Sequence, residues 1–228
     1  METLLVPIHR AGWPFIALFV VVTIILLLFS KILGMIGLAL TGWCIYFFRN
    51  PKRVTPLGEG LIISPGDGIV TKIEKAIPPK ELKWSKTPLI RVSIFLNVFD
   101  VHVNRIPVEG VITKIHYHPG KFFNASLDKA SQHNERNSIL LKTSLGQEIL
   151  VVQIAGLIAR RILCDVKEGQ EMNAGETFGI IRFGSRVDLY LPEGVNPQVI
   201  KGQRMIGGET IIGDLHSSAP QRIGKIYL

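Results

Sequence analysis

Residues 182–187 read Arg-Phe-Gly-Ser-Arg-Val and join two strand-like runs, at residues 177–182 and 187–191. The pair Gly184-Ser185 is ordinary turn chemistry for such a junction. It can also be a peptide bond that breaks itself, because a serine hydroxyl can attack the carbonyl before it and turn the amide into an ester. β-Elimination then leaves a dehydroalanine, which hydrolyses to a pyruvoyl group. That reaction needs a glycine on the acyl side, so that attack is unhindered, and a base for the hydroxyl.

The composition indicates a membrane segment in addition to a globular part. The 228 residues suffice for one or two domains with a sizeable core. The hydrophobic fraction is 47% and the net charge is +8. Residues 1–53 hold five Lys or Arg and one Asp or Glu, so this short part carries +4 of that excess. Since there is no dense Lys/Arg run, the charge favours an anionic membrane surface as partner, and no nucleic acid.

The two cysteines, Cys44 and Cys164, suit neither a disulfide framework nor a metal site. Both are expected to be small buried hydrophobic residues, which is compatible with a reducing cytoplasm. His, Cys, Asp and Glu nowhere have the spacing of a metal-binding set, so we expect no metal.

Two uncharged runs near the N-terminus predict a membrane anchor. Residues 11–30 carry no charge over 20 residues, which is enough to cross a hydrocarbon core of about 30 Å as a helix. After Lys31, residues 32–48 form a second uncharged run of 17. This run ends in aromatic residues followed by three basic residues, a pattern typical of a helix that leaves the bilayer on its cytoplasmic side.

We therefore predict a helical hairpin within residues 1–53, with both ends in the cytoplasm, followed by a globular domain at residues 54–228. The globular domain is then expected on the cytoplasmic side of the cell membrane. The alternatives are a cleaved signal peptide or a hairpin buried within protein. No clear small-residue cleavage site follows the first run, and a second apolar run comes directly after it, which disfavours a signal peptide.

The rest of the chain is predicted to be mainly β. Short runs rich in β-branched residues, separated by Gly, Pro, Asn and Asp, predict strands at residues 61–64, 69–73, 89–98, 108–116, 138–143, 148–154, 162–166 and 178–183. One short helix is predicted at residues 123–133. A motif at residues 169–177, with Gly-Gln and Gly-Glu-Thr, returns at residues 202–210 and resembles the paired hairpins of lipoyl-type domains. The expected fold is a β-sandwich or barrel-like domain with lipoyl-like hairpin repeats, after an N-terminal transmembrane helical hairpin.

Two polar clusters are candidates for chemistry. The first is the turn at residues 64–68 (SPGDG), where Asp-Gly between two apolar runs is a strong hairpin signal. Alternatively, this rigid turn holds the Asp67 carboxylate where it could orient an imidazole. The second cluster follows an apolar strand, and strand alternation places Asp100, His102 and Asn104 on one side of it. His102 is either a structural histidine or a base suited to proton transfer at neutral pH.

Taken together, these motifs resemble the phosphatidylserine decarboxylases, in particular their short membrane-anchored subclass from bacteria and archaea. The resemblance covers nearly the whole chain. It rests on six motifs in order: residues 46–49 (YFFR), 64–68 (SPGDG), 95–105 (FLNVFDVHVNR), 119–122 (PGKF), 134–137 (NERN) and 183–188 (FGSRVD). Any one of them is weak, but six in order are specific.

The resemblance implies a proenzyme that cleaves itself between Gly184 and Ser185. The products would be a β chain (1–184) and an α chain (185–228), which stay associated, and Ser185 would become a covalent pyruvoyl cofactor. Family members use an Asp and a His to assist the serine, and these match Asp67 and His102. The longer enzymes of the family carry a second histidine where this sequence has Arg105, so any role shared by two histidines must fall to His102 or to another group.

The implied reaction converts phosphatidylserine to phosphatidylethanolamine and CO2, by way of a Schiff base between the lipid amine and the pyruvoyl group. His102, oriented by Asp67, is expected to remove the Ser185 proton and later to protonate the carbanion. Three basic residues are unranked candidates to hold the lipid phosphate or the serine carboxylate: Arg105, Lys121 and Arg136.

Other interpretations stay open at this point. The same chemistry could act on archaetidylserine, because the headgroup is shared. A different class of protein would be a non-enzymatic membrane-anchored adaptor with a lipoyl-like domain, in which Ser185 is only a turn residue. A lipoyl carrier needs a modifiable lysine at the hairpin tip, and the junction at residues 183–186 offers Gly-Ser instead. A homodimer is an expectation from the family alone.

Overall fold

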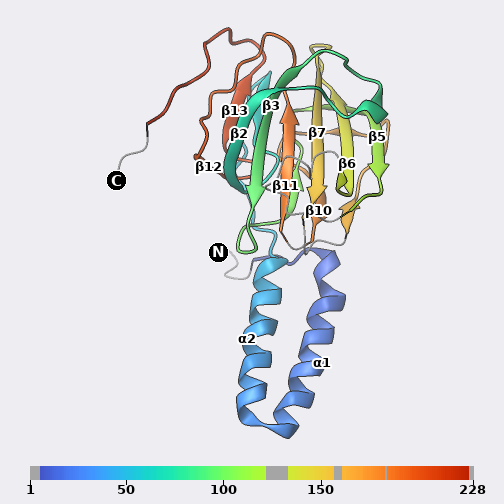
Figure 1. Ribbon diagram of the computed structural model, residues 1–228, viewed down its shortest axis with the longest axis vertical. Coiled ribbons are helices and arrows are strands. Elements are labelled where there is room, and N and C mark those ends of the chain that lie inside the picture. Colours follow the sequence, from blue (N-terminus) through green and yellow to red (C-terminus); the bar gives the residue numbers. More distant parts are fainter. Residues whose placement is uncertain (1–5, 122–132, 157–160, 183, 226–228) are drawn as a thin grey trace.

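The computed structural model describes residues 6–121, 133–156, 161–182 and 184–225, and it places a β domain on one end of a helical hairpin (Figure 1). The helices are η1 (Arg10–Gly12), α1 (Trp13–Phe29), α2 (Lys31–Phe47) and η2 (Lys80–Leu82). The strands are β1 (Leu61–Ile63), β2 (Gly68–Ala76), β3 (Leu89–Leu96), β4 (Val103–Arg105), β5 (Gly110–His118), β6 (Arg136–Lys142), β7 (Glu148–Ala155), β8 (Ile162–Cys164), β9 (Glu171–Met172), β10 (Thr177–Ile181), β11 (Ser185–Tyr190), β12 (Arg204–Met205) and β13 (Ile211–Asp214). This confirms the predicted mainly β fold with an apolar N-terminal helix. The helix predicted at residues 123–133 lies, except for its last residue, outside the described residues.

The two long helices pack closely on each other and expose apolar side chains outward. A Cβ atom on Gly37 would lie only 2.8 Å from the Oγ1 atom of Thr23, so the glycine allows α2 to approach α1. The hydroxyls of Thr23 and Thr41 share a hydrogen bond of 3.0 Å between the helices. On the outside, Leu28 and Phe29 are each 81% exposed, which suits contact with lipid rather than water.

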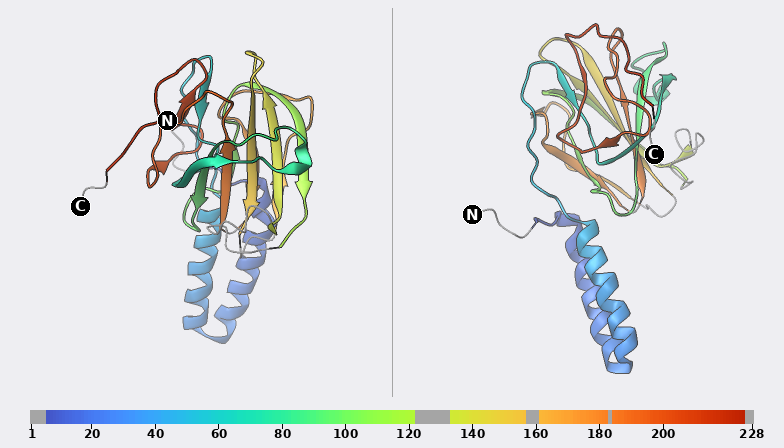
Figure 2. Two further views of the ribbon diagram at one scale, coloured as in Figure 1. Left: turned by 45° about the horizontal axis from the view of Figure 1, so that its top comes forward. Right: turned by 90° about the vertical axis from the view of Figure 1, so that its left-hand side faces the viewer.

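Within the described residues, one helical stretch, Arg10–Phe29, is long and apolar enough to cross a membrane. The second helix, Lys31–Phe47, is apolar but shorter. The two turned views in Figure 2 show both helices projecting together from one end of the β domain. The anchor thus indicates membrane association.

In the described part of the chain, the strands form three antiparallel sheets. The largest has eight strands in the order β12-β2-β3-β11-β7-β6-β5-β9, and the smaller ones are β4-β10-β8 and β1-β13. One face of the large sheet packs against both small sheets to form the main hydrophobic core, which includes Leu96, Val187, Phe178 and Ile212. Alternation along each strand therefore divides the residues of the large sheet between this interior face and an outer face.

The β domain consists of two halves built to the same plan. Strands β1 and β2 recur as β4 and β5, of equal lengths and 42 positions later, since Leu61 and Val103 begin the two pairs. Strand β1 pairs with β13 as β4 pairs with β10, and β2 pairs with β12 as β5 pairs with β9. The glycine-containing repeat at residues 169–177 and 202–210 therefore corresponds to equivalent turns at opposite edges of the large sheet. The halves meet at the central pair, β11 and β7.

Two glycines at equivalent positions allow this plan. A Cβ atom on Gly68, at the start of β2, would lie 2.2 Å from the carbonyl oxygen of Phe95. A Cβ atom on Gly110, at the start of β5, would lie 2.4 Å from the carbonyl oxygen of Lys142. Only glycine permits so close an approach of the neighbouring strand.

The hairpin predicted at residues 64–68 is wrong. Strands β1 and β2 flank this turn but do not pair with each other, because β1 pairs with β13 and β2 pairs with β3 and β12. The Asp-Gly pair instead marks the point where the chain passes from a small sheet to the large one. Distant strand pairing has overridden the local turn signal.

The anchor docks on the β domain through a hydrophobic cluster. Phe47, at the end of α2, is fully buried and belongs to one cluster with Val101, Val103 and Ile180. Because Val101 and Val103 flank His102 in the sequence, the segment that carries the candidate base rests directly on the anchor.

Candidate active site

Gly184-Ser185 lies where the chain crosses from the three-stranded sheet to the large one. Strand β10, before it, pairs with β4 and β8, whereas β11, after it, pairs with β3 and β7. Gly184 has a φ of +74°, which favours glycine, and apart from its two chain neighbours no residue that the structure describes comes within 4 Å of the place where a Cβ would stand. The acyl side of the bond is therefore sterically open.

The side chain of Ser185 faces the interior of the domain. Ser185 is the first residue of β11 and pairs with Leu96 on β3 and Ala155 on β7, both of which are in the main core. The residue is completely buried, and its Oγ atom has no hydrogen-bond partner. A buried hydroxyl without a partner is costly, so its presence calls for an explanation in function.

His102 contacts the peptide N–H of Gly184, one peptide unit before the Gly184–Ser185 bond. Its Nε2 atom accepts a hydrogen bond from the backbone N–H of Gly184 at 3.2 Å. Its Nδ1 atom lies 3.0 Å from the carbonyl oxygen of Asp100 and donates to it. The imidazole is fully buried, with its ring centroid 4.3 Å from that of Phe47. Burial lowers the pKa of His102 to about 4, so the ring is neutral at pH 7.

Asp67 does not orient this imidazole in the structure. Its carboxylate forms an ion pair with Arg53, at 2.7 Å, and accepts a hydrogen bond from the backbone N–H of Gly207 at 2.8 Å. Burial raises the pKa of Asp67, although the charge of Arg53 opposes that rise. The expected Asp67–His102 hydrogen bond is thus replaced by a bond from His102 to its own backbone, through the carbonyl of Asp100.

The polar residues around His102 lie in the interior of the protein. Asp100, His102 and Asn104 are all buried, and Val101 and Val103 pack in one cluster with the anchor, where His102 also contacts Phe47. The Asp100 carboxylate accepts a hydrogen bond from the backbone N–H of Asn97 and forms an ion pair with Arg204.

Of the three predicted substrate-binding residues, Arg105 is engaged elsewhere and Lys121 lies on the surface. The guanidinium of Arg105 donates to the carbonyl oxygens of Gly175 and Pro51, at 2.8 and 2.9 Å, and to the Oδ1 atom of Asn50 at 2.7 Å. Arg105 therefore ties the end of the anchor to the β domain. Lys121 is exposed and forms an isolated bridge with Asn134.

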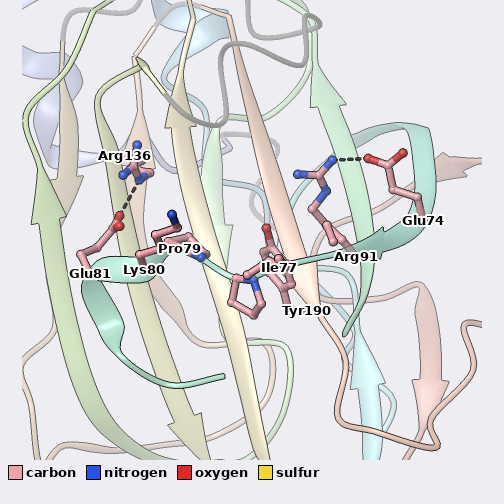
Figure 3. Close-up of a pocket in the computed structure, with 10 residues that line it drawn as sticks. Glu74, Ile77, Pro79, Lys80, Glu81, Arg91, Arg136 and Tyr190 are labelled. Atoms are coloured by element: carbon pink, nitrogen blue, oxygen red, sulfur yellow. Dashed lines mark hydrogen bonds and ion pairs between the residues drawn. The ribbon is translucent and has the colours of Figure 1, made fainter. Parts of the chain in front are cut away.

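Arg136 lies on the outer face of the large sheet. It pairs in register with Ile154, which pairs with Arg186, so all three point away from the face that carries Ser185. Its Nε atom lies 2.6 Å from Glu81, and the two border a pocket of about 660 Å³ between the sheet and the segment after β2 (Figure 3). The structure therefore does not bring Arg136 together with His102 and Ser185.

Sequence reasoning missed Arg182, which lies directly after strand β10. Its guanidinium lies 5.0 Å from the ring centroid of Phe15, near the start of α1, and its Nε atom is buried without a partner. Burial and then the nearby charge of Arg161 lower the pKa of Arg182. Among the described residues no carboxylate forms an ion pair with it. The basic residue of the cleavage motif was visible in the sequence, but its position beside the anchor was not.

Comparison with known proteins identifies the family of the chain. The family model described as phosphatidylserine decarboxylase matches residues 40–213. A "Phosphatidylserine decarboxylase proenzyme" of Cereibacter sphaeroides is 56% identical over 224 residues, covering 98% of this chain and 97% of the relative. Proteins of the same name from Rickettsia akari and Rickettsia bellii are each 60% identical over 207 residues, covering 91% of this chain and 90% of the relative. The chain therefore belongs to the phosphatidylserine decarboxylase family.

Proposed function

We propose that this protein cleaves itself between Gly184 and Ser185 and then decarboxylates phosphatidylserine to phosphatidylethanolamine. The observation that carries the proposal is the pair formed by His102 and the cleavage site. A neutral, buried imidazole touches the N–H of Gly184, and the next residue presents a buried hydroxyl without a partner. The relatives that share most of this chain are named proenzymes of this decarboxylase.

The residues present fit the precursor of a pyruvoyl group. In the cleavage, a bond forms between Ser185 Oγ and the Gly184 carbonyl carbon, and the amide C–N bond breaks. In this first step the hydroxyl proton passes to the departing amine nitrogen, and His102 is the group placed to carry it. In the structure the Nε2 atom of His102 accepts a hydrogen bond from the Gly184 N–H. To take the proton, the imidazole must turn from this N–H toward the hydroxyl of Ser185.

The ester is then broken by β-elimination: the Cα proton of Ser185 is lost, the Cβ–Oγ bond breaks, and the oxygen stays on Gly184 as its new carboxylate. Water then hydrolyses the dehydroalanine to the pyruvoyl group and releases ammonia.

When formed, the pyruvoyl group supplies a reactive carbonyl conjugated to an amide, which accepts the electron pair left behind by CO2. His102 would remain beside this position as a neutral group able to hold and return a proton. The aromatic ring of Phe47 and the buried surroundings of His102 exclude water from it. Exclusion of water favours return of the proton from the protein rather than from solvent.

The strand pairing supports continued association of the two pieces after cleavage. Strand β11 begins at Ser185 and is hydrogen-bonded to β3 on one side and to β7 on the other. Its residues Val187 and Leu189 are fully buried in the core. The α chain would therefore stay in the sheet once its covalent link to the β chain is lost. A homodimer remains an expectation from the family.

The position of the site suits a lipid substrate. The proposed site lies beside the hairpin, because the Arg182 guanidinium lies 5.0 Å from the ring centroid of Phe15 of α1, and His102, which contacts Gly184, packs on Phe47 of α2. We place the lipid phosphate beside Arg182, because phosphate would supply the anion that the described residues do not. The basic residues at this end of the hairpin, Arg10 and Arg49, favour a cytoplasmic β domain.

The proposal predicts two chains in the purified protein. Intact mass should show pieces 1–184 and 185–228, and the smaller should resist N-terminal sequencing because a pyruvoyl group has no amine. A Ser185→Ala variant should remain one chain and have no decarboxylase activity. A wild-type protein that stays a single uncleaved chain would contradict the proposal.

A further inference from the structure

A ladder of three buried amide side chains crosses the interior of the β domain. The Nδ2 atom of Asn137, on β6, donates to the Oε1 atom of Gln153, on β7, at 3.0 Å. The Nε2 atom of Gln153 donates in turn to the Oδ1 atom of Asn104, on β4, at 2.8 Å. The three residues are between 0 and 2% exposed. The ladder links the large sheet to the three-stranded sheet, which carries Asn104. It also fixes the orientation of the Asn104 amide.

The last amide of this ladder is incomplete. The Nδ2 atom of Asn104 is buried and has no hydrogen-bond acceptor. A buried amide donor that lacks a partner is disfavoured, since it has lost its water without a replacement. In an otherwise well-paired network, such a donor suggests an acceptor that is present only at some stage of the reaction.

The free donor lies in the same interior space as Ser185. Asn104 lies in β4, two residues after His102, whose Nε2 atom contacts the N–H of Gly184. Gln153 donates a hydrogen bond to Asn104 and pairs with Val187, two residues after Ser185 on β11. Its side chain therefore lies on the same face of the large sheet as that of Ser185.

Gly66 gives a second measure of this proximity. The place where a Cβ of Gly66 would stand is 3.3 Å from Asn104 Nδ2 and 3.6 Å from the side chain of Leu96, the residue that pairs with Ser185. The amide of Asn104 and the immediate neighbour of Ser185 therefore border the same small space.

We infer that Asn104 is a catalytic hydrogen-bond donor for self-cleavage, which stabilises the negative charge on the Gly184 carbonyl oxygen during attack by Ser185. Gln153 and Asn137 are positioning residues that hold the Asn104 amide with its N–H free. The inference rests on the proposed function, because it requires that this bond be cleaved.

The chemistry follows from where charge appears. As Ser185 Oγ bonds to the carbonyl carbon, the carbonyl oxygen gains the electron pair of the C=O π bond and becomes an oxyanion. When the C–N bond breaks, that pair returns to form the ester carbonyl, and the proton from the hydroxyl leaves on the amine. A donor fixed in advance in a buried site stabilises the oxyanion without having to reorganise.

An internal control separates this role from ordinary imperfect pairing. Ser138, next to Asn137, also has a buried hydroxyl without a partner. Its side chain lies on the outer face, because Ser138 pairs with Val152, whose side chain belongs to the outer cluster. If an unpartnered buried group affected only stability, substitutions at Asn104 and at Ser138 would act alike. If Asn104 is the donor for cleavage, only its substitution should slow cleavage.

The test measures self-cleavage of the full-length chain, followed by denaturing gel after synthesis, with and without hydroxylamine, which traps the ester. We expect Asn104→Leu and Asn104→Asp to slow cleavage about 100-fold, the typical effect of losing one oxyanion donor. The Asp variant keeps the oxygen that accepts from Gln153, so the ladder remains in place. Ser138→Ala should cleave at the wild-type rate. Hydroxylamine should not restore cleavage in the Asn104 variants, because ester formation itself is slowed.

Two results would overturn the inference. One is a folded Asn104→Asp or Asn104→Leu protein, judged by its circular dichroism and melting temperature, that cleaves within threefold of wild type. The other is a variant that hydroxylamine cleaves at the wild-type rate, since the defect would then lie after ester formation. If wild type itself does not cleave, the proposed function fails instead, so the two failures are distinguishable.

Discussion

The Nε2 atom of His102 lies 3.2 Å from the backbone nitrogen of Gly184, one residue before the hydroxyl of Ser185. The imidazole is held from its other side by the carbonyl of Asp100, at 3.0 Å. This geometry fixes a neutral imidazole one peptide unit before the bond that is proposed to break, and it also shows that the Nε2 atom already accepts a hydrogen bond. In the proposed mechanism, His102 must exchange its hydrogen bond to the Gly184 N–H for one to the Ser185 hydroxyl before cleavage.

Replacing His102 by Gln should slow self-cleavage by at least about 100-fold, because general-base catalysis typically contributes that much. Glutamine keeps a polar side chain but cannot carry the proton. The rate is measured by the appearance of the smaller piece on a denaturing gel. His216→Gln, at an exposed histidine, is the matched control and should cleave normally. Normal cleavage in the His102 variant would exclude it as the base.

The low pKa of His102 should make the protein less stable in acid. The folded value is about 4 against 6.5 for the free side chain, so between these values the unfolded chain binds a proton that the folded chain does not. The contribution of His102 to the free energy of unfolding is therefore complete above pH 6.5 and is lost as the pH falls toward 4. The full loss is roughly 3 kcal/mol, since one pKa unit corresponds to about 1.4 kcal/mol. We expect this loss of stability in the uncleaved Ser185→Ala protein. The double variant Ser185→Ala/His102→Gln should lose less, because glutamine does not bind a proton in this pH range. Denaturant unfolding at pH 7.5 and 4.5 measures it, and equal losses in both proteins would contradict the assignment.

Asp67 is expected to act through Arg53 rather than through His102. Asp67→Asn should destabilise the protein by about 3 kcal/mol and slow cleavage, because it leaves the mostly buried Arg53 without its counter-charge. Adding Arg53→Met should recover much of both losses, since both charges are then gone. A double variant that regains stability but not cleavage would instead make Asp67 a direct participant in the reaction.

Arg182 should matter for the lipid and not for chain cleavage. We expect Arg182→Gln to cleave normally and to raise KM for phosphatidylserine in mixed micelles about tenfold, which corresponds to about 1.4 kcal/mol of lost phosphate contact. Arg10→Gln removes an equal charge from the same end of the hairpin, where Arg10 pairs with Asp165, and is the control. If KM rises equally in both variants, the effect is only the general attraction between a basic residue and the anionic micelle surface, and Arg182 does not hold the phosphate.

The sequence was sufficient to predict the features that depend on local pattern. The uncharged runs at residues 11–30 and 32–48 correspond to α1 and α2, and the β-branched runs correspond to the longer strands. The three polar residues Asp100, His102 and Asn104 are buried, and the two valines between them pack with the anchor. These features follow from hydropathy and periodicity, which each segment carries in itself.

Features that depend on pairing between distant segments could not be predicted in this way. The Asp67 turn has the local chemistry of a hairpin, yet its flanking strands find partners more than a hundred residues away in β13 and β12. Nothing in the sequence says that Arg53 would take the Asp67 carboxylate, or that Arg136 would lie on the outer face. The face of a residue is set by strand register, and the register of this sheet is set by the whole fold.

The most direct test of the account is the intact mass of the purified full-length protein beside its Ser185→Ala variant. We predict two wild-type chains divided after Gly184, with the smaller lighter than the peptide 185–228 by the mass of one ammonia and blocked at its N-terminus. The variant should be a single chain of 228 residues. A wild-type protein that is also a single chain, or whose smaller piece begins with an intact serine, would contradict the claim that Ser185 becomes the cofactor.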